Sequence, residues 1–413
     1  MNFNRAKTGV FVLEGLNAVS TTYYFYYLYF FTERTFHFDK FHNLLLAAAL
    51  GFLYTIASAL CGRFAQKRGY FLSLKIGFAT MAGSLAVGAV VTSLPGHLLV
   101  MTVCNIGMCF TWPTLEALVS ENEPPLRLQR MVGIYNLVWA GGGAFAYFTG
   151  GAMLENLGLR SIFITPGMII LVQLAFLLRL EHAGRMPAGQ PQATEAPNKI
   201  APAHPEDRLR SPVSPQTFLK MAWLANPFAY LAINTLIAVM PSLAKHLELT
   251  PQLAGFCGSL WMFVRFVAFW LLWRRPGWHY RFRWLAGAYA ALIVSFGLIL
   301  LAPNVGVLVA AQCVFGFATG LIYYSSLYYA MDVGETKGEH GGLHEAALGA
   351  GSCAGPGIGA AALHFFPNNP DGSTWAVSAL LLAGLAGLFA LRFWRRSDSP
   401  LLQNGQTHHA GGN

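Results

Sequence analysis

The chain has 413 residues, of which 55% are hydrophobic and only 11% charged, and its formal net charge is +9. A soluble globular protein carries roughly 25% charged residues, so the composition excludes a soluble globular domain. The basic residues are spread over short loops and are not gathered on one face, so the positive charge does not indicate binding to nucleic acid.

Apolar residues recur in blocks of about 20, the length of a helix that crosses the hydrocarbon core of a bilayer, and the mean hydropathy is +0.46. The sequence therefore predicts an all-α polytopic membrane protein with twelve transmembrane helices. The first span is too long for a signal peptide and no small-residue cleavage site follows it, so we expect it to remain a membrane helix. The predicted spans lie near residues 7–31, 43–65, 70–92, 97–120, 130–154, 160–180, 217–243, 251–273, 283–302, 304–331, 340–365 and 374–394.

Lysine and arginine indicate the orientation. With the N-terminus inside, only Arg34, Lys40, Arg160 and Lys245 fall on the outer side, and Arg265 falls within a span. The other basic residues lie on the cytoplasmic side, as the positive-inside rule requires. We therefore expect both termini in the cytoplasm, and the helical spans favour the inner membrane of a bacterium.

Residues 182–215 differ from the rest of the chain because they are rich in proline, alanine and polar residues and have no apolar periodicity. This composition predicts a flexible cytoplasmic linker. The linker separates a six-helix bundle in 1–181 from a second one in 216–396, and 397–413 is expected to be a disordered cytoplasmic tail.

The two bundles share a sequence pattern. Segment 133–154 aligns without gaps to 342–363, with the identical pairs Gly133/Gly342, Gly142/Gly351, Gly150/Gly359, Ala152/Ala361 and Leu154/Leu363. The same register pairs Cys104 with Cys313 and Gly107 with Gly316 one span earlier. One register held over two helices indicates a duplicated six-helix unit and predicts two pseudo-symmetric bundles.

The cytoplasmic loop after the second span reads GRFAQKRGY and has a counterpart, WRRPGWHYR, after the eighth. Its Gly62, Lys67 and Gly69 fit the signature loop of the major facilitator superfamily, and Gln66 stands where that family has aspartate. With its twelve spans and its repeat, the sequence resembles this superfamily over essentially its whole length. The resemblance implies that the loop takes part in gating at the cytoplasmic side.

A second signature of the superfamily, usually found in span five of antiporters, stands here in span eleven as Gly351, Gly355, Pro356 and Gly359. Small residues four apart let two membrane helices approach closely, and the proline permits a bend. These features suit a helix that rocks between two states, so we assign the four residues to gating; static helix packing is the alternative.

Enzymatic motifs are absent from the sequence. There is no phosphate-binding Gly-x-x-x-x-Gly-Lys-Ser/Thr loop and no His-Glu-x-x-His motif, and no pair of the six cysteines has zinc-site spacing. We therefore expect neither an enzyme nor a bound metal or cofactor.

The resemblance implies that spans one, four, seven and ten line a central cavity. Candidate substrate-binding side chains at helical spacing on these spans are Asn17, Tyr24, Trp112, Asn234, Gln312, Tyr323 and Tyr324. Two alternatives stay open. Gln312, like Asn105, can be a hydrogen-bonding contact between helices, and the tyrosines can form an aromatic belt at the membrane interface.

Arg265 is charged and lies within span eight, where a charge is costly and usually functional. It can bind an anionic group of the substrate, or it can neutralise Glu345 or Glu14. A third possibility is that its side chain extends to the cytoplasmic interface.

Glu14 and Glu345 are carboxylates within spans, and Glu116 lies one turn from the end of span four. A buried carboxylate that can gain and lose a proton suits proton coupling, with His344 as a relay. The alternative for Glu14 and Glu345 is a structural ion pair with Arg265. Glu116 is a candidate gate residue or lies at the interface.

Together these features predict a secondary active transporter that works by alternating access of two bundles to one central site. The expected substrate is a small polar organic solute of anionic or sugar-like kind, and the expected coupling ion is the proton. One alternative is proton-driven efflux of amphipathic compounds, favoured by the aromatic residues and the glycine–proline motif. A remote one is a transporter-like receptor. We expect a monomer in the lipid bilayer, with no nucleic acid as partner.

Overall fold

The computed structural model describes residues 5–121, 123, 125–182, 213–333 and 338–394. These residues form twelve long α-helices and one short 3₁₀ helix. The predicted linker and tail fall largely outside the described residues. The helices are α1 (Arg5–Phe36), α2 (Lys40–Arg68), α3 (Tyr70–Val90), α4 (Leu94–Ser120), α5 (Pro125–Asn156), α6 (Ser161–His182), α8 (Pro215–His246), α9 (Pro251–Arg274), η1 (Pro276–Trp278), α10 (Phe282–Leu300), α11 (Val305–Val333), α12 (Gly338–Phe365) and α13 (Gly372–Trp394).

Eleven of these helices are long and apolar enough to cross a membrane, and α1 is the one that falls outside this group. Its sequence carries Glu14, Asn17 and a run of tyrosines. Most of its side chains are buried against other helices, including Tyr23, Tyr24 and Tyr27. A helix surrounded by protein does not need the lipid-facing apolar surface of the other eleven, which accounts for its polar composition.

Capping residues set where several helices begin. Ser214 accepts a hydrogen bond from the backbone N–H of Thr217 at 3.3 Å, and Thr250 accepts one from Leu253 at 3.2 Å. Each capping residue is followed directly by a proline, which suits the first helical position because no N–H is needed there. The turn at the start of α9 is therefore encoded locally.

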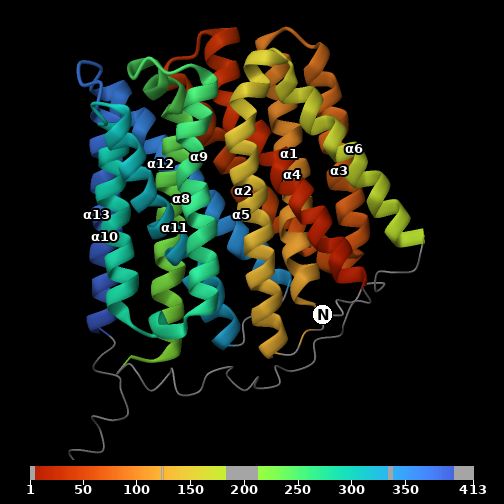
Figure 1. Cartoon of the computed structure of the whole chain (residues 1–413), viewed down its shortest axis with the longest axis vertical. Helices are drawn as coiled ribbons and strands as arrows, with labels where there is room; N and C mark the ends of the chain where they lie inside the picture. Colours follow the sequence, from red (N-terminus) through yellow and green to blue (C-terminus); the bar gives the residue numbers. More distant parts are fainter. Residues whose placement is uncertain (1–4, 122, 124, 183–212, 334–337, 395–413) are drawn as a thin grey trace, which may run out of the picture.

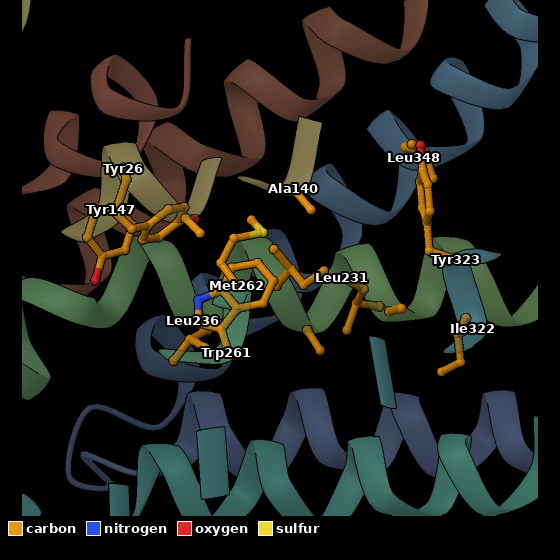
Figure 2. Packing of buried hydrophobic residues seen from close by; sticks show 14 of the residues in the cluster. Tyr26, Ala140, Tyr147, Leu231, Leu236, Trp261, Met262, Ile322, Tyr323 and Leu348 are labelled. Carbon is orange, nitrogen blue, oxygen red and sulfur yellow. The ribbon is translucent and has the colours of Figure 1, made fainter. Parts of the chain in front are cut away.

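The two halves of the chain stand side by side (Figure 1), with the N-terminal helices in red to yellow and the C-terminal helices in green to blue. The main contacts between the halves are α2 with α12 and α5 with α9. Aromatic residues join them along the second pair. In Figure 2, Tyr147 of α5 lies near Trp261 of α9, and their rings meet edge to face with centres 5.6 Å apart.

Paired glycines of the sequence repeat occupy equivalent packing positions. A side-chain carbon added to Gly142 of α5 would lie 3.0 Å from a backbone oxygen of α1, and one added to Gly351 of α12 would lie 2.0 Å from the backbone oxygen of Pro227 in α8. Helices α1 and α8 are the first of their halves. The glycines shared by the repeat thus permit the same close helix contact twice.

The predicted gating glycines contact different partners. Gly355 also faces α8, where an added carbon would lie 2.5 Å from Leu231 oxygen, whereas the nearest atom to one at Gly359 would be 3.4 Å away. Pro356 is buried within α12. The first two glycines therefore hold α12 against α8 inside the C-terminal half.

The C-terminal end of α2 carries the other predicted gating residues. Gly62 lies against Gly342 of α12, so here the backbones of the two halves are close. Gln66 and Lys67 are exposed. Gly69 has φ +99°, a left-handed conformation that favours glycine, and it ends α2.

Candidate functional site

A cavity of about 200 Å³ lies between the two halves. Both halves contribute to its wall, including α1, α2, α4 and α5 from the first and α8, α9, α11 and α12 from the second. Of the residues predicted from the sequence to bind substrate, Trp112, Asn234, Arg265 and Tyr323 line this cavity. Residues far apart in sequence are therefore brought to one central place.

Arg265 projects from α9 and is only 1% exposed. Its Nε and Nη2 atoms have no hydrogen-bond partner within the described part of the chain. No carboxylate lies within 4.0 Å of its guanidinium among those residues. A guanidinium cannot lose its charge in a protein, so Arg265 places a positive charge with unpaired N–H groups beside the cavity.

Aromatic rings lie close to the Arg265 guanidinium. Its central carbon lies 4.7 Å from the centre of the Trp139 ring and 4.8 Å from that of Tyr323. Phe269 lies at 5.4 Å. These cation–π contacts hold the buried charge without neutralising it, which leaves the N–H edge available for an anion.

Glu345 of α12 also lines the cavity and is 9% exposed. The hydroxyl of Tyr54 on α2 donates a hydrogen bond to its Oε2 atom at 2.8 Å. This bond joins the two halves. The cavity therefore holds a cation from α9 and a carboxylate from α12 that are not paired with each other.

Two further carboxylates lie on the N-terminal side of the same region. Glu14 of α1 is fully buried, and neither of its carboxylate oxygens has a hydrogen-bond partner among the described residues. Glu116 of α4 is half-buried. Glu14 is within electrostatic range of Glu116 and Glu345. Three acidic groups from three helices thus act on one another.

His344 is half-buried and lies outside the cavity lining. Its ring meets Tyr323 edge to face, with ring centres 6.0 Å apart. Its Nε2 atom has no hydrogen-bond partner among the described residues.

The other predicted binding residues also lie outside the cavity lining. Tyr24 packs against Phe163 with ring centres 6.0 Å apart, and Tyr324 packs against Trp278 at 5.8 Å. Asn17 and Gln312 are fully buried, without a hydrogen-bond partner for their side-chain amides in the described ranges. Asn105, in contrast, donates a hydrogen bond from α4 to Leu50 oxygen in α2 at 2.8 Å and lines the cavity.

Several lining residues did not follow from the sequence patterns considered, including Tyr54, Trp139 and Tyr147. They come from α2 and α5, which we did not expect to line the cavity. The repeat held a signal for one of them. Trp139 aligns with Leu348, and both line the cavity.

A bundle of membrane-spanning helices in two similar halves, with a central cavity that contains buried polar groups from both, defines a polytopic transport protein. The family model described as Major Facilitator Superfamily matches residues 10–356. The chain belongs to this superfamily.

Solved structures share the fold over nearly the whole chain. The human organic anion transporter MFSD10 (TETRAN) is 17% identical, with a TM-score of 0.69, and the match covers 94% of this chain and 98% of that one. The nucleoside transporter NupG is 15% identical, with a TM-score of 0.65, and the match covers 94% of this chain and 99% of that one. No curated protein sequence matches the chain.

Proposed function

We propose that this protein is a proton-coupled transporter of small organic anions. The observation that carries the proposal is the side chain of Arg265, which is buried beside the central cavity with two guanidinium nitrogens unpartnered among the described residues. A hydrogen bond between charged groups is among the strongest non-covalent contacts in a protein, and a carboxylate fits the planar guanidinium edge.

The remaining lining of the cavity suits an organic body attached to the anionic group. Trp112, Tyr230 and Tyr323 supply aromatic surface, and Asn234 supplies a polar group. Asn234 also donates a hydrogen bond to Ser352 at 2.8 Å. One charged contact and a mainly aromatic wall are typical of a site for an organic solute.

The solved structures provide supporting analogies of different kinds. MFSD10 is an organic anion transporter, whereas NupG is a nucleoside transporter. An uncharged nucleoside or sugar leaves Arg265 without a counter-charge, whereas an anion supplies one. The unpaired guanidinium of Arg265 therefore favours the anion.

We infer that the coupling ion is a proton from the environment of Glu345. Its carboxylate lines the same cavity as Arg265 and has no cationic partner within 4.0 Å among the described residues. A proton is the smallest species that can neutralise a buried carboxylate. The proposal extends this role to Glu14 and Glu116, whose charges would interact with that of Glu345.

The first test is thermal unfolding of the purified protein with benzoate, lactate, uridine, glucose and tetraphenylphosphonium, each at pH 5.5 and 7.5. A ligand that binds the folded state raises the unfolding temperature. We expect the anions to do so in the wild type and not in Arg265→Gln. Tyr324→Phe, which changes a buried tyrosine outside the cavity lining, should keep the response. Stabilisation by tetraphenylphosphonium alone would replace the proposal with efflux of amphipathic cations.

Transport itself is tested in proteoliposomes. An inward proton gradient should drive accumulation of the stabilising anion, and collapse of the gradient with an ionophore should abolish it. Ligand binding without any accumulation or exchange would indicate a receptor instead.

A further inference from the structure

Arg265 contacts aromatic rings from both halves of the protein. Trp139 belongs to α5 in the N-terminal half, whereas Arg265 and Tyr323 belong to α9 and α11 in the C-terminal half. The rings of Trp139 and Tyr323 are parallel within 5°, with centres 5.5 Å apart. The guanidinium carbon lies within 4.8 Å of both ring centres.

Trp139 differs from the other rings near this guanidinium. Phe269, Tyr230 and Trp261 lie between 5.4 and 6.0 Å from the guanidinium carbon, and all three belong to the C-terminal half. Among the described residues, Trp139 is therefore the one ring within 6.0 Å that ties Arg265 to the opposite half.

The strength of this tie depends on the charge of Arg265. A guanidinium is attracted to the face of an aromatic ring because its positive charge meets the negative face of the ring, and the attraction is strongest where water is excluded. An anion that pairs with the N–H edge offsets that positive charge. The attraction to Trp139 then weakens, although neither ring needs to be displaced.

We propose that Trp139, Arg265 and Tyr323 form a brace between the two halves, which stabilises the conformation seen here and which the substrate anion loosens when it pairs with Arg265. This inference rests on the proposed anion site. It adds a physical link between occupancy of that site and movement of the halves, since the same guanidinium takes part in both.

Thermodynamic reciprocity gives the brace a measurable effect on binding. If an anion weakens the brace, then the brace must weaken anion binding by the same factor. Trp139→Leu should therefore bind benzoate more tightly than the wild type, by about 3- to 30-fold if a buried cation–π contact is lost. Trp139→Phe keeps an aromatic ring that attracts the guanidinium more weakly, so its affinity for benzoate should lie between those of the wild type and Trp139→Leu.

Phe269→Leu is the matched control. It removes a ring 5.4 Å from the same guanidinium, but that ring comes from the half that carries Arg265. Phe269 also packs against Trp139, with ring centres 6.0 Å apart. Phe269→Leu nevertheless keeps Trp139 and its contacts with Arg265 and Tyr323, whereas Trp139→Leu removes them.

The position of the halves is measured by the distance between spin labels at residues 67 and 275, in a background in which the six native cysteines are replaced. Lys67 and Arg275 are exposed, near the cytoplasmic ends of α2 and α9. Benzoate should shift the distance distribution of the wild type. Trp139→Leu should show part of that shift without benzoate, and Phe269→Leu should not.

Two results would overturn the brace. One is an unchanged benzoate-free distribution in both Trp139 variants, and the other is an equal shift in Phe269→Leu and Trp139→Leu. Failure of the anion proposal can be distinguished from failure of the brace, because in that case no anion binds to the wild type. In that case the benzoate-free distributions still decide whether Trp139 holds the halves together.

Discussion

The Tyr54 hydroxyl donates a hydrogen bond to the Glu345 carboxylate across the boundary between the two halves, over 2.8 Å. The bond joins α2 to α12, and Glu345 lines the same cavity as Arg265. A hydroxyl donor stabilises the ionised form of the carboxylate that accepts its hydrogen bond.

Tyr54→Phe removes this donor and leaves the ring in place. The Glu345 carboxylate then loses its hydrogen-bond donor from the opposite half. We expect the midpoint of proton-driven uptake in proteoliposomes to shift in pH. Tyr324→Phe removes a hydroxyl elsewhere and should leave the midpoint in place. If the pH profile of uptake is unchanged in Tyr54→Phe, Glu345 does not take part in proton coupling.

Glu345→Gln should abolish accumulation driven by a pH gradient and spare exchange of substrate between the two sides, because a glutamine cannot carry a proton through the cycle. Glu14→Gln tests whether the fully buried carboxylate on α1 shares this role. Radiolabelled uptake and counterflow in proteoliposomes separate the two activities. If accumulation survives in both variants, neither carboxylate is the coupling group.

Arg265→Lys keeps the positive charge and loses the planar guanidinium edge. We expect weaker binding of organic anions, by about 10- to 100-fold for the loss of one charge-assisted hydrogen bond. Arg265→Gln should lose binding altogether. Titration by calorimetry measures both, and equal affinities in the wild type and Arg265→Gln would exclude Arg265 as the anion ligand.

Gly351 and Gly359 belong to one sequence motif and differ in the space around them. A carbon added at Gly351 would lie 2.0 Å from the Pro227 backbone oxygen, so Gly351→Ala must push α12 away from α8. We expect a loss of about 1–3 kcal/mol of stability. At Gly359 the nearest atom is 3.4 Å away, so Gly359→Ala should be neutral or slightly stabilising. Thermal unfolding in detergent compares them, and equal effects would contradict the packing assigned to Gly351.

Asp39 lies outside the membrane spans, at the start of α2. Partial burial favours its neutral form, but hydrogen bonds from the backbone N–H and the ring of His42 outweigh this effect and lower the pKa of Asp39. Because the pKa is lower in the folded state, the stabilisation is present above the unfolded pKa of about 3.9 and is lost as the pH falls through the folded value.

Asp39→Ala should therefore cost about 1 kcal/mol at pH 7, the usual value of a capping side chain, and much less at acidic pH. Asp39→Asn can still accept the capping hydrogen bond and should remain close to the wild type at pH 7. Unfolding temperatures between pH 3 and pH 7 test this capping role of Asp39. A loss of stability in Asp39→Ala that does not depend on pH would refute it.

The sequence was sufficient to predict the helices, the superfamily and the existence of a repeat. Apolar blocks of about 20 residues leave the helix as almost the only structure that a chain can form in lipid, and each block is visible in a short stretch of sequence. The register between segments 133–154 and 342–363 also has a structural counterpart, since Gly142 and Gly351 meet the first helix of their own halves.

The cavity was predicted less completely, because its walls depend on how helices rotate against one another. Tyr24 and Tyr323 are both tyrosines on expected cavity helices, yet only Tyr323 lines the cavity. Trp139 and Tyr54 lie on helices that pack between the halves, where one side faces the partner helix and another faces the cavity. Helical periodicity alone does not separate those two sides.

The polar composition of α1 also bears on how the protein is made. This helix is the one that lacks the apolar character of the other eleven candidate spans, while the next helix, α2, has a span hydropathy of 2.1. Release of a segment from the translocon into lipid depends on its hydrophobicity. We therefore expect α1 to enter lipid less readily by itself than its neighbours, so that its place in the membrane depends on the helices that pack around it.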